Sequence, residues 1–168
     1  MSASRVANSE TFNVSTPSPR EIRLTRLFDA PRLLVWDVLH NAEHIRHWWG
    51  ALGEGYSVPV CEIDFRVGGK WRFINQTAKG ERAEFYGEYF EIDAPGRVVS
   101  SEVFAPFPES PSRVTTVLTE EDSKTRITLT AEYPSPEVRD MVLGTGMERG
   151  AALSYDQIEV IAARLAGN

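Results

Sequence analysis

Three histidines have the spacing in this sequence that is most suggestive of metal chemistry. His44 and His47 are three residues apart on a predicted helix, close enough to share a metal ion. Zinc sites usually add a cysteine or contain a His-Glu-x-x-His pattern, and neither occurs beside these residues. We therefore interpret His44 and His47, together with His40, as solvated residues of a helix surface, and we expect no metal site.

Nucleophilic and cofactor chemistry have no convincing motif in the chain. Cys61 is the single cysteine and falls on the apolar face of a predicted strand, where a thiol is normally inert. Ser100 and Ser154 lack the Gly-x-Ser-x-Gly pattern of a nucleophile elbow. The glycines from Gly144 to Gly150 do not have dinucleotide-binding spacing, because the third comes one place late and the segment opens no βαβ unit. We therefore assign no catalytic residue and no cofactor.

Proton transfer is the chemistry that the sequence leaves open. Buried acids with shifted pKa values support such chemistry when they lie in a cavity. Tyr86, Tyr89, Tyr133 and Glu88 are the polar residues available for it, and the sequence does not decide which of them point inward.

Trp48 and Trp49 are neighbours on a predicted helix, so their side chains diverge by about 100° and cannot fill the same gap. One interpretation is an aromatic wall at the mouth of a cavity, where an indole offers apolar area and one N–H donor. The other is core packing where the helix meets the sheet. Both interpretations stay open.

Small residues stand near the start of the last predicted helix. Gly150, Ala151 and Ser154 follow Met147 there, and the strands expected opposite are rich in Phe, Tyr and Trp. Small residues that face large ones either interlock as a dense core or leave a void for an apolar ligand. The residues that we expect to line such a void and bind a ligand are Trp48, Trp49, Phe65, Trp71, Phe73, Tyr86, Tyr89, Met147, Gly150, Ala151 and Ser154.

The elements that must position these residues follow from hydrophobic periodicity. A strand near residues 22–28 leads into two short helices, near 31–40 and 41–49, and a long helix closes the chain near 146–165. Alternating apolar residues predict strands between them, and short turns between neighbours make the sheet antiparallel. These strands lie near 61–67, from 70 onward, and near 82–92, 97–105, 112–120 and 124–132.

Glycines predict two local features of this sheet. An odd-numbered loop at Gly68-Gly69 would align the apolar faces of the flanking strands and set Phe65 opposite Trp71. Gly87 predicts a bulge within its own strand.

Composition and charge limit the class of protein. The 168 residues fit one domain, placed at 21–168 after a flexible N-terminal tail, 1–20, in which Phe12 and Val14 could add a short edge strand. A net charge of −6 argues against nucleic acid as a partner, and no apolar run approaches the ~20 residues of a membrane span. A single cysteine and the absence of an apolar N-terminal segment favour a cytoplasmic protein.

Several motifs occur in an order that resembles a known family. They are Phe28-Asp29-Ala30-Pro31, Trp48-Trp49-Gly50, Cys61-Glu62-Ile63-Asp64 with Gly68-Gly69, and Gly146-Met147-Glu148. This order resembles the SRPBCC (START-like, helix-grip) superfamily and, within it, the family named after the homologue of the activator of heat-shock-protein-90 ATPase. The resemblance implies an α+β helix-grip fold, with a curved antiparallel sheet of six or seven strands around a long C-terminal helix and two short helices after the first strand.

The resemblance leaves three functional hypotheses, because the superfamily includes lipid carriers, plant hormone receptors, polyketide cyclases and a co-chaperone domain. The first is a non-catalytic binding domain that holds a small hydrophobic or aromatic molecule between the sheet and the last helix. The second is a polyketide cyclase-like or hydrolase-like enzyme that uses the same cavity. The third is a co-chaperone-like module that binds a protein partner, and a homodimer also stays open. None of the three implies nucleic acid, a membrane or a cofactor.

Overall fold

The computed structural model describes residues 12–50 and 54–167 as one curved antiparallel sheet that wraps a long C-terminal helix. The strands are β1 (Phe12–Ser15), β2 (Glu21–Phe28), β3 (Ser57–Ile63), β4 (Lys70–Gln76), β5 (Arg82–Asp93), β6 (Arg97–Phe104), β7 (Ser112–Glu121) and β8 (Lys124–Glu132). The helices are α2 (Arg32–His40), α3 (Ala42–Ile45), α4 (Pro136–Leu143) and α5 (Met147–Leu165). The helix-grip fold expected from the sequence is therefore confirmed.

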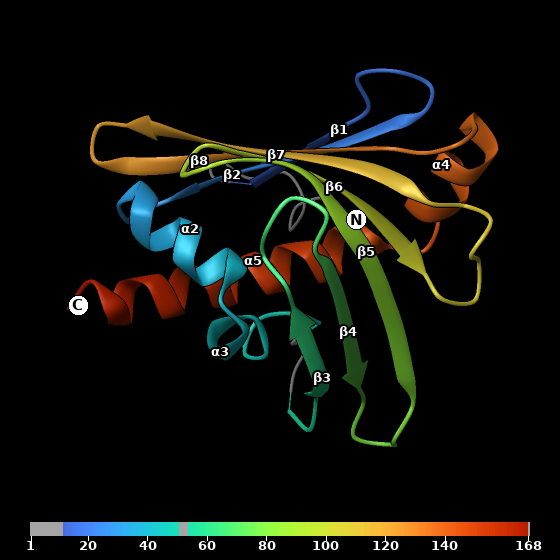
Figure 1. The fold of residues 1–168 in the computed structure, drawn as a ribbon, viewed down its shortest axis with the longest axis horizontal. Helices are drawn as coiled ribbons and strands as arrows, with labels where there is room; N and C mark the ends of the chain where they lie inside the picture. The colour runs from blue at the N-terminus through green and yellow to red at the C-terminus, as the bar shows by residue number, and fades with distance from the viewer. Residues whose placement is uncertain (1–11, 51–53, 168) are drawn as a thin grey trace.

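The sheet has the order β1-β2-β8-β7-β6-β5-β4-β3, and all its neighbours pair antiparallel. Its eight strands exceed the expected six or seven, because β1 adds a strand at the edge beside β2. Figure 1 shows β3, β4 and β5 descending steeply from the layer formed by β2, β8 and β7, with α5 running across the concave side.

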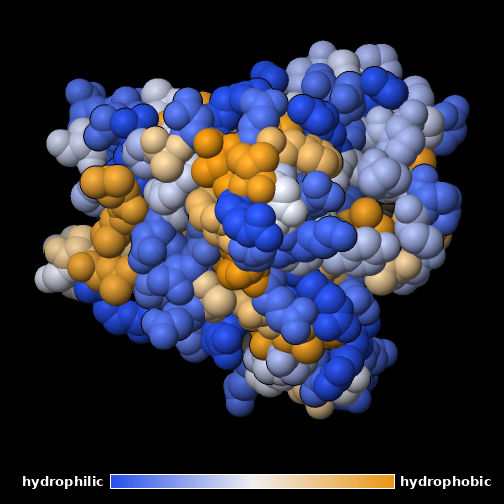
Figure 2. Space-filling model, viewed as in Figure 1, coloured by the Kyte–Doolittle hydropathy of each residue, from blue (hydrophilic) through white to orange (hydrophobic). Residues whose placement is uncertain are grey.

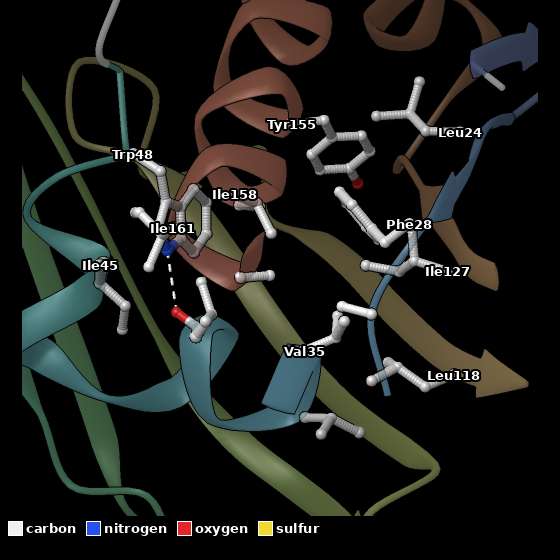
Figure 3. Close-up of a cluster of buried hydrophobic side chains, with 14 of the residues drawn as sticks. Leu24, Phe28, Val35, Ile45, Trp48, Leu118, Ile127, Tyr155, Ile158 and Ile161 are labelled. Atoms are coloured by element: carbon white, nitrogen blue, oxygen red, sulfur yellow. Dashed lines mark hydrogen bonds between the residues drawn. The ribbon is translucent and has the colours of Figure 1, made fainter. Parts of the chain in front are cut away.

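The concave side of the sheet and α5 enclose the hydrophobic core. Tyr155, Ile158 and Ile161 are at most 5% exposed on α5, and their side chains point toward residues of β2, β8 and α2 in Figure 3. Among these neighbours, Phe28 and Val35 are completely buried. The spacing of apolar residues that predicted one continuous face on the last helix is thus the spacing that packs it against the sheet.

One charged residue also faces inward from β2. Every second residue of this strand is buried, and Arg26 takes one of these positions with 8% exposure. Its guanidinium lies 2.7 Å from the Asp156 carboxylate and 3.6 Å from that of Glu159, both on α5. A buried cation needs such partners, so this pair of contacts ties the helix to the first long strand.

The two short helices after β2 differ slightly from expectation. The side chain of Asn41 caps α3 by accepting a hydrogen bond from the Glu43 amide, as its residue type favours. The α-helix ends at Ile45, however, and the chain continues as turns in which the amides of His47 and Trp48 bond to carbonyls three residues back. The second helix is therefore shorter than the 41–49 that the sequence indicated.

The hairpin between β3 and β4 has a different register from the predicted one. Ile63, and not Phe65, lies opposite Trp71, because residues 64–69 form a long turn with its own backbone hydrogen bonds. The Arg66 amide bonds to the Asp64 carbonyl, and the Gly69 amide bonds to the Arg66 carbonyl. The observed register differs from the predicted one by two residues. Because side chains alternate between the two faces of a strand with a period of two, the apolar faces of β3 and β4 still match.

Gly87 does not mark a bulge as predicted. The ladder between β5 and β6 becomes irregular after Tyr89, between Tyr89 and Glu91. A Cβ atom at position 87 would overlap the Ser101 carbonyl oxygen and would lie 2.6 Å from the Trp71 indole nitrogen. This glycine is required by close approach of a neighbouring strand and an indole ring.

The surface shown in Figure 2 is mostly hydrophilic, with hydrophobic residues exposed in a few separate areas. Large hydrophobic side chains exposed on the helices include Leu33 of α2 and Val160 and Leu165 of α5. No helix among the described residues is long and apolar enough to cross a membrane.

A cavity between the sheet and the last helix

A cavity of about 420 Å³ lies between the concave face of the sheet and α5. It receives side chains from β2, from β4 to β8, from α2 and α5, and from residues 48–50. Nine of the eleven residues expected from the sequence to line a void do so: Trp48, Trp49, Trp71, Phe73, Tyr89, Met147, Gly150, Ala151 and Ser154. The sheet and the helix therefore leave a space where the small residues of α5 face the aromatic strands.

Phe65 and Tyr86 are the two expected residues that do not line the cavity. Phe65 lies in the turn after β3, where its ring stacks on His40 at 4.2 Å and meets Tyr89 edge-on at 5.1 Å. Tyr86 lies between the lining residues Phe85 and Tyr89 with the opposite parity, so its side chain points to the other face of the sheet. Phe65 therefore packs against two residues of the cavity wall, His40 and Tyr89, and Tyr86 lies outside the cavity.

Trp48 and Trp49 take different roles at the edge of the cavity. Trp48 is 8% exposed, and its indole nitrogen donates a buried hydrogen bond to the Val38 carbonyl at 2.9 Å. Trp49 is less buried and belongs to an aromatic cluster, with ring centroids 4.9 Å from Phe73, 5.6 Å from Phe85 and 5.9 Å from Trp71. The packing interpretation thus fits Trp48, and the aromatic-wall interpretation fits Trp49.

His40 is not the solvated residue that the sequence suggested. It lines the cavity from α2, its ring stacks on Phe65, and its Nδ1 is buried without a hydrogen-bond partner among the described residues. Burial lowers the pKa of His40 to about 4, so the ring is neutral at physiological pH. Its neighbour His44 instead approaches Asp37, with Nε2 3.3 Å from Oδ2.

The remaining side chains considered for chemistry are not arranged as a reactive centre. Within residues 12–50 and 54–167, no three His, Cys, Asp or Glu side chains lie close enough together to hold a metal ion. Cys61 is half-buried, and burial raises the pKa of its thiol, which disfavours the nucleophilic thiolate. Asp64 and Arg66 form an exposed ion pair at 2.9 Å in the turn after β3.

Glu102 is the functional candidate that the sequence analysis missed. It lines the cavity from β6, and its carboxylate has no hydrogen bond or ion pair with any residue that the structure describes. Burial raises the pKa of Glu102 to about 7. Glu102 shares one face of β6 with Val98 and Ser100, which also line the cavity, but the residue types along this strand do not alternate and gave no signal for it.

Tyrosine hydroxyls accompany this acid. Burial raises the pKa of Tyr133 and of Tyr155. The negative charge of Glu102 raises the pKa of Tyr133 further, whereas at Tyr155 the positive charge of Arg26 opposes the rise more than Glu102 adds to it. The Tyr155 hydroxyl is buried and finds no hydrogen-bond partner among the described residues. The apolar cavity therefore contains a small set of polar groups that have their hydrogen-bonding capacity free, with Glu102 as the acid of the set.

A curved antiparallel sheet that grips a long C-terminal helix around such a cavity defines a START-like, helix-grip domain. The family model for the activator of Hsp90 ATPase homolog 1-like proteins matches residues 29–163, and the chain belongs to this family. The matched range contains α2 to α4, most of α5 and all the strands except β1 and β2.

Solved structures of low sequence identity have the same fold. A protein from Rhodobacter sphaeroides is 21% identical with a TM-score of 0.82, and the match covers 92% of this chain and 99% of that one. A protein from Nitrosomonas europaea is 20% identical with a TM-score of 0.79, over 91% of this chain and 100% of the other. A protein from Mycobacterium smegmatis is 24% identical with a TM-score of 0.78, over 91% and 98%. A search of curated proteins gives no match.

Proposed function

We propose that this protein is a binding domain for a small hydrophobic or aromatic molecule, held in the cavity between the sheet and α5. The observation that carries the proposal is the cavity itself: about 420 Å³, with indole, phenyl and aliphatic side chains over most of its wall. Ligand pockets typically have about 300–1,000 Å³ and a mainly apolar lining with a few placed polar groups. Both the size and the lining fit a ligand of one or two fused or linked rings.

The aromatic cluster at one side of the cavity supports an aromatic or otherwise flat ligand. Trp49, Trp71, Phe73 and Phe85 contact one another mostly edge-on or tilted, with centroids 4.8 to 5.9 Å apart. Such a wall presents both ring faces and ring edges to a bound ring. The small residues Gly150 and Ala151 line the cavity from α5 and leave room for the ligand.

Titration with N-phenyl-1-naphthylamine, an uncharged fluorescent probe, tests this function. We expect saturable 1:1 binding under native conditions, with transfer of excitation from Trp49 and Trp71 to the probe because both indoles line the cavity. Probe fluorescence that rises linearly without saturation, with tryptophan emission unchanged, would contradict the proposal.

A second candidate function is supported by Glu102. An unpaired acid with a pKa of about 7 in an apolar cavity has the property of a general acid or base, because catalytic proton transfer is most efficient when the pKa lies near the working pH. A polyketide cyclase-like enzyme would use Glu102, with Tyr133 beside it, to move protons on a bound substrate. Incubation with aromatic 1,3-diketones tests it: turnover by the wild type that Glu102→Gln abolishes would favour the enzyme, and absence of turnover would leave the binding function.

A further inference from the structure

The described lining of the cavity contains one acidic side chain and no basic partner for it. Among the described lining residues, no lysine or arginine is present, and Glu102 is the one carboxylate. It lies on the inward face of β6 beside Val98 and Ser100, and no described residue donates a hydrogen bond to its side chain. Glu102 is only half-buried, so its carboxylate stays accessible from the cavity. An acid that lines an apolar cavity without a protein partner is a polar group that a ligand can engage.

The titratable groups that line the same cavity as Glu102 do not supply a positive charge. His40 of α2 is neutral because burial lowers its pKa to about 4, and burial raises the pKa values of Tyr89, Tyr133 and Tyr155 above the ordinary range. These residues come from α2, β5, β8 and α5, which are elements that line the cavity.

The buried cation near this region is already engaged. Arg26 of β2 bonds to Asp156 at 2.7 Å and lies 3.6 Å from Glu159, so its charge is matched by carboxylates of α5. Ser112 of β7, the residue that pairs with Glu102 across the strands, bonds to the Glu102 backbone carbonyl and leaves the carboxylate free. The carboxylate therefore has open acceptor positions toward the cavity.

We propose that the ligand of this cavity is an amphipathic cation, in which an aromatic or aliphatic body fills the apolar wall and a protonated nitrogen pairs with Glu102. This deepens the proposed binding function and rests on it. A charge-assisted hydrogen bond between an ammonium group and a carboxylate in an apolar site is roughly twice as strong as a neutral one. Indole and phenyl faces of the aromatic cluster add attraction for a cation, and the net charge of −6 favours approach of positive ligands.

The proposal predicts a specific dependence on pH. Glu102 must be ionised to pair with the ammonium group, and its pKa is about 7 in the unliganded cavity. The fraction ionised rises about tenfold between pH 6 and pH 8, so the affinity for an amine should rise by about the same factor. A neutral ligand of the same shape should show no such change, because none of the other groups facing the cavity titrates in this range.

Two matched probes test the charge of the ligand: naphthalen-2-ylmethylamine, which is protonated at pH 8, and naphthalen-2-ylmethanol, which is neutral and nearly isosteric. Calorimetric titration of the wild type at pH 8 should show affinity for the amine that is about tenfold or more above that for the alcohol. Glu102→Gln keeps the shape of the side chain and should abolish this preference, because the variant lowers the affinity for the amine to about that for the alcohol. The matched control is Glu88→Gln, because Glu88 lies on β5 outside the lining and should leave the preference unchanged.

The outcomes separate this inference from the proposed function. If the alcohol binds saturably and the amine binds no more tightly, or if the amine preference survives Glu102→Gln, the cationic ligand is excluded and the hydrophobic-ligand function stands. If neither probe binds saturably, both proposals fail. The pH dependence in the wild type needs no variant, so an amine affinity that is flat from pH 6 to pH 8 overturns the inference even if Glu102→Gln does not fold.

Discussion

The indole nitrogen of Trp48 donates a hydrogen bond to the carbonyl oxygen of Val38 at 2.9 Å, in the buried space between α2 and the turns that follow α3 (Figure 3). This bond joins two segments that form one edge of the cavity. It also separates the roles of two adjacent tryptophans, because Trp49 has no such bond among the described residues and instead packs in the aromatic wall.

Trp48→Phe should lower stability more than Trp49→Phe. The first variant leaves the buried Val38 carbonyl without its donor, which costs about 1–3 kcal/mol of unfolding free energy. The second retains a ring in the wall and should change stability less, but it should weaken binding of N-phenyl-1-naphthylamine. Urea unfolding of both variants, with a probe titration of each, measures the two effects. The assignment is wrong if Trp49→Phe is the less stable variant.

Ala151→Leu and Ala152→Leu make the same change at adjacent positions of α5. Ala151 lines the cavity, whereas Ala152 is 3% exposed and packed in the core. A leucine at 151 should fill empty space, leave stability equal or higher and block the probe. A leucine at 152 should overpack the core and cost about 1–3 kcal/mol. Thermal unfolding distinguishes them, and equal destabilisation by both would show that the cavity does not extend to Ala151.

Glu102→Gln should stabilise the unliganded protein at pH 8 by about 2–3 kcal/mol relative to the wild type. The folded-state pKa of Glu102 is raised from 4.5 to about 7, so the wild type loses stability as pH rises from about 4.5 through 7. Glutamine has no such penalty. Urea unfolding of both proteins from pH 4.5 to pH 8 should show curves that coincide at the acidic end and diverge above it.

His40 changes the stability of the protein with pH in the opposite direction to Glu102, over an overlapping pH range. The effect of Glu102 must therefore be measured as the difference between the wild type and Glu102→Gln. The folded-state pKa of His40 is lowered from 6.5 to about 4, so its contribution is present above pH 6.5 and is lost as pH falls toward 4. This term is common to the wild type and to Glu102→Gln, and it cancels in their difference. A difference that does not change with pH would show that Glu102 is solvated or paired.

Tyr155→Phe should raise stability by about 1 kcal/mol in the absence of ligand. The Tyr155 hydroxyl is buried without a partner among the described residues, and the variant removes the cost of keeping it out of water while preserving the ring. The ring contacts with Phe12 and Phe28, at 5.7 and 5.9 Å, remain. Calorimetric melting measures the change, and a clear loss of stability would mean that the hydroxyl has a partner.

Much of the fold was predictable because it depends on local patterns. Alternation along β2 and the spacing of Ile158 and Ile161 on α5 set which faces are buried, and most of this pattern is readable from residue types alone. The register of the hairpin between β3 and β4 was not predictable, because it is set by the backbone hydrogen bonds of the turn at 64–69, which no side-chain pattern encodes.

The candidate site was predictable only in its apolar part. Aromatic residues and small helix residues identified most of the wall. His40 and Glu102 were missed because their burial depends on what packs against them: Phe65 stacks on His40, and the curvature of the sheet brings Glu102 of β6 to face α5. A lone acid or histidine in an amphipathic element is ordinarily a surface residue, and only the tertiary structure shows otherwise.

The location of a bound hydrophobic probe distinguishes a ligand-binding cavity from a site on the outer surface. Intermolecular nuclear Overhauser effects between N-phenyl-1-naphthylamine and methyl-labelled protein should appear at Ile127, Leu129 and Ala151, whose side chains line the cavity. Contacts to the exposed methyls of Leu33 and Val160 instead, which are 72% and 55% exposed, would place the probe on the outer surface of α2 and α5 and contradict a ligand-binding cavity.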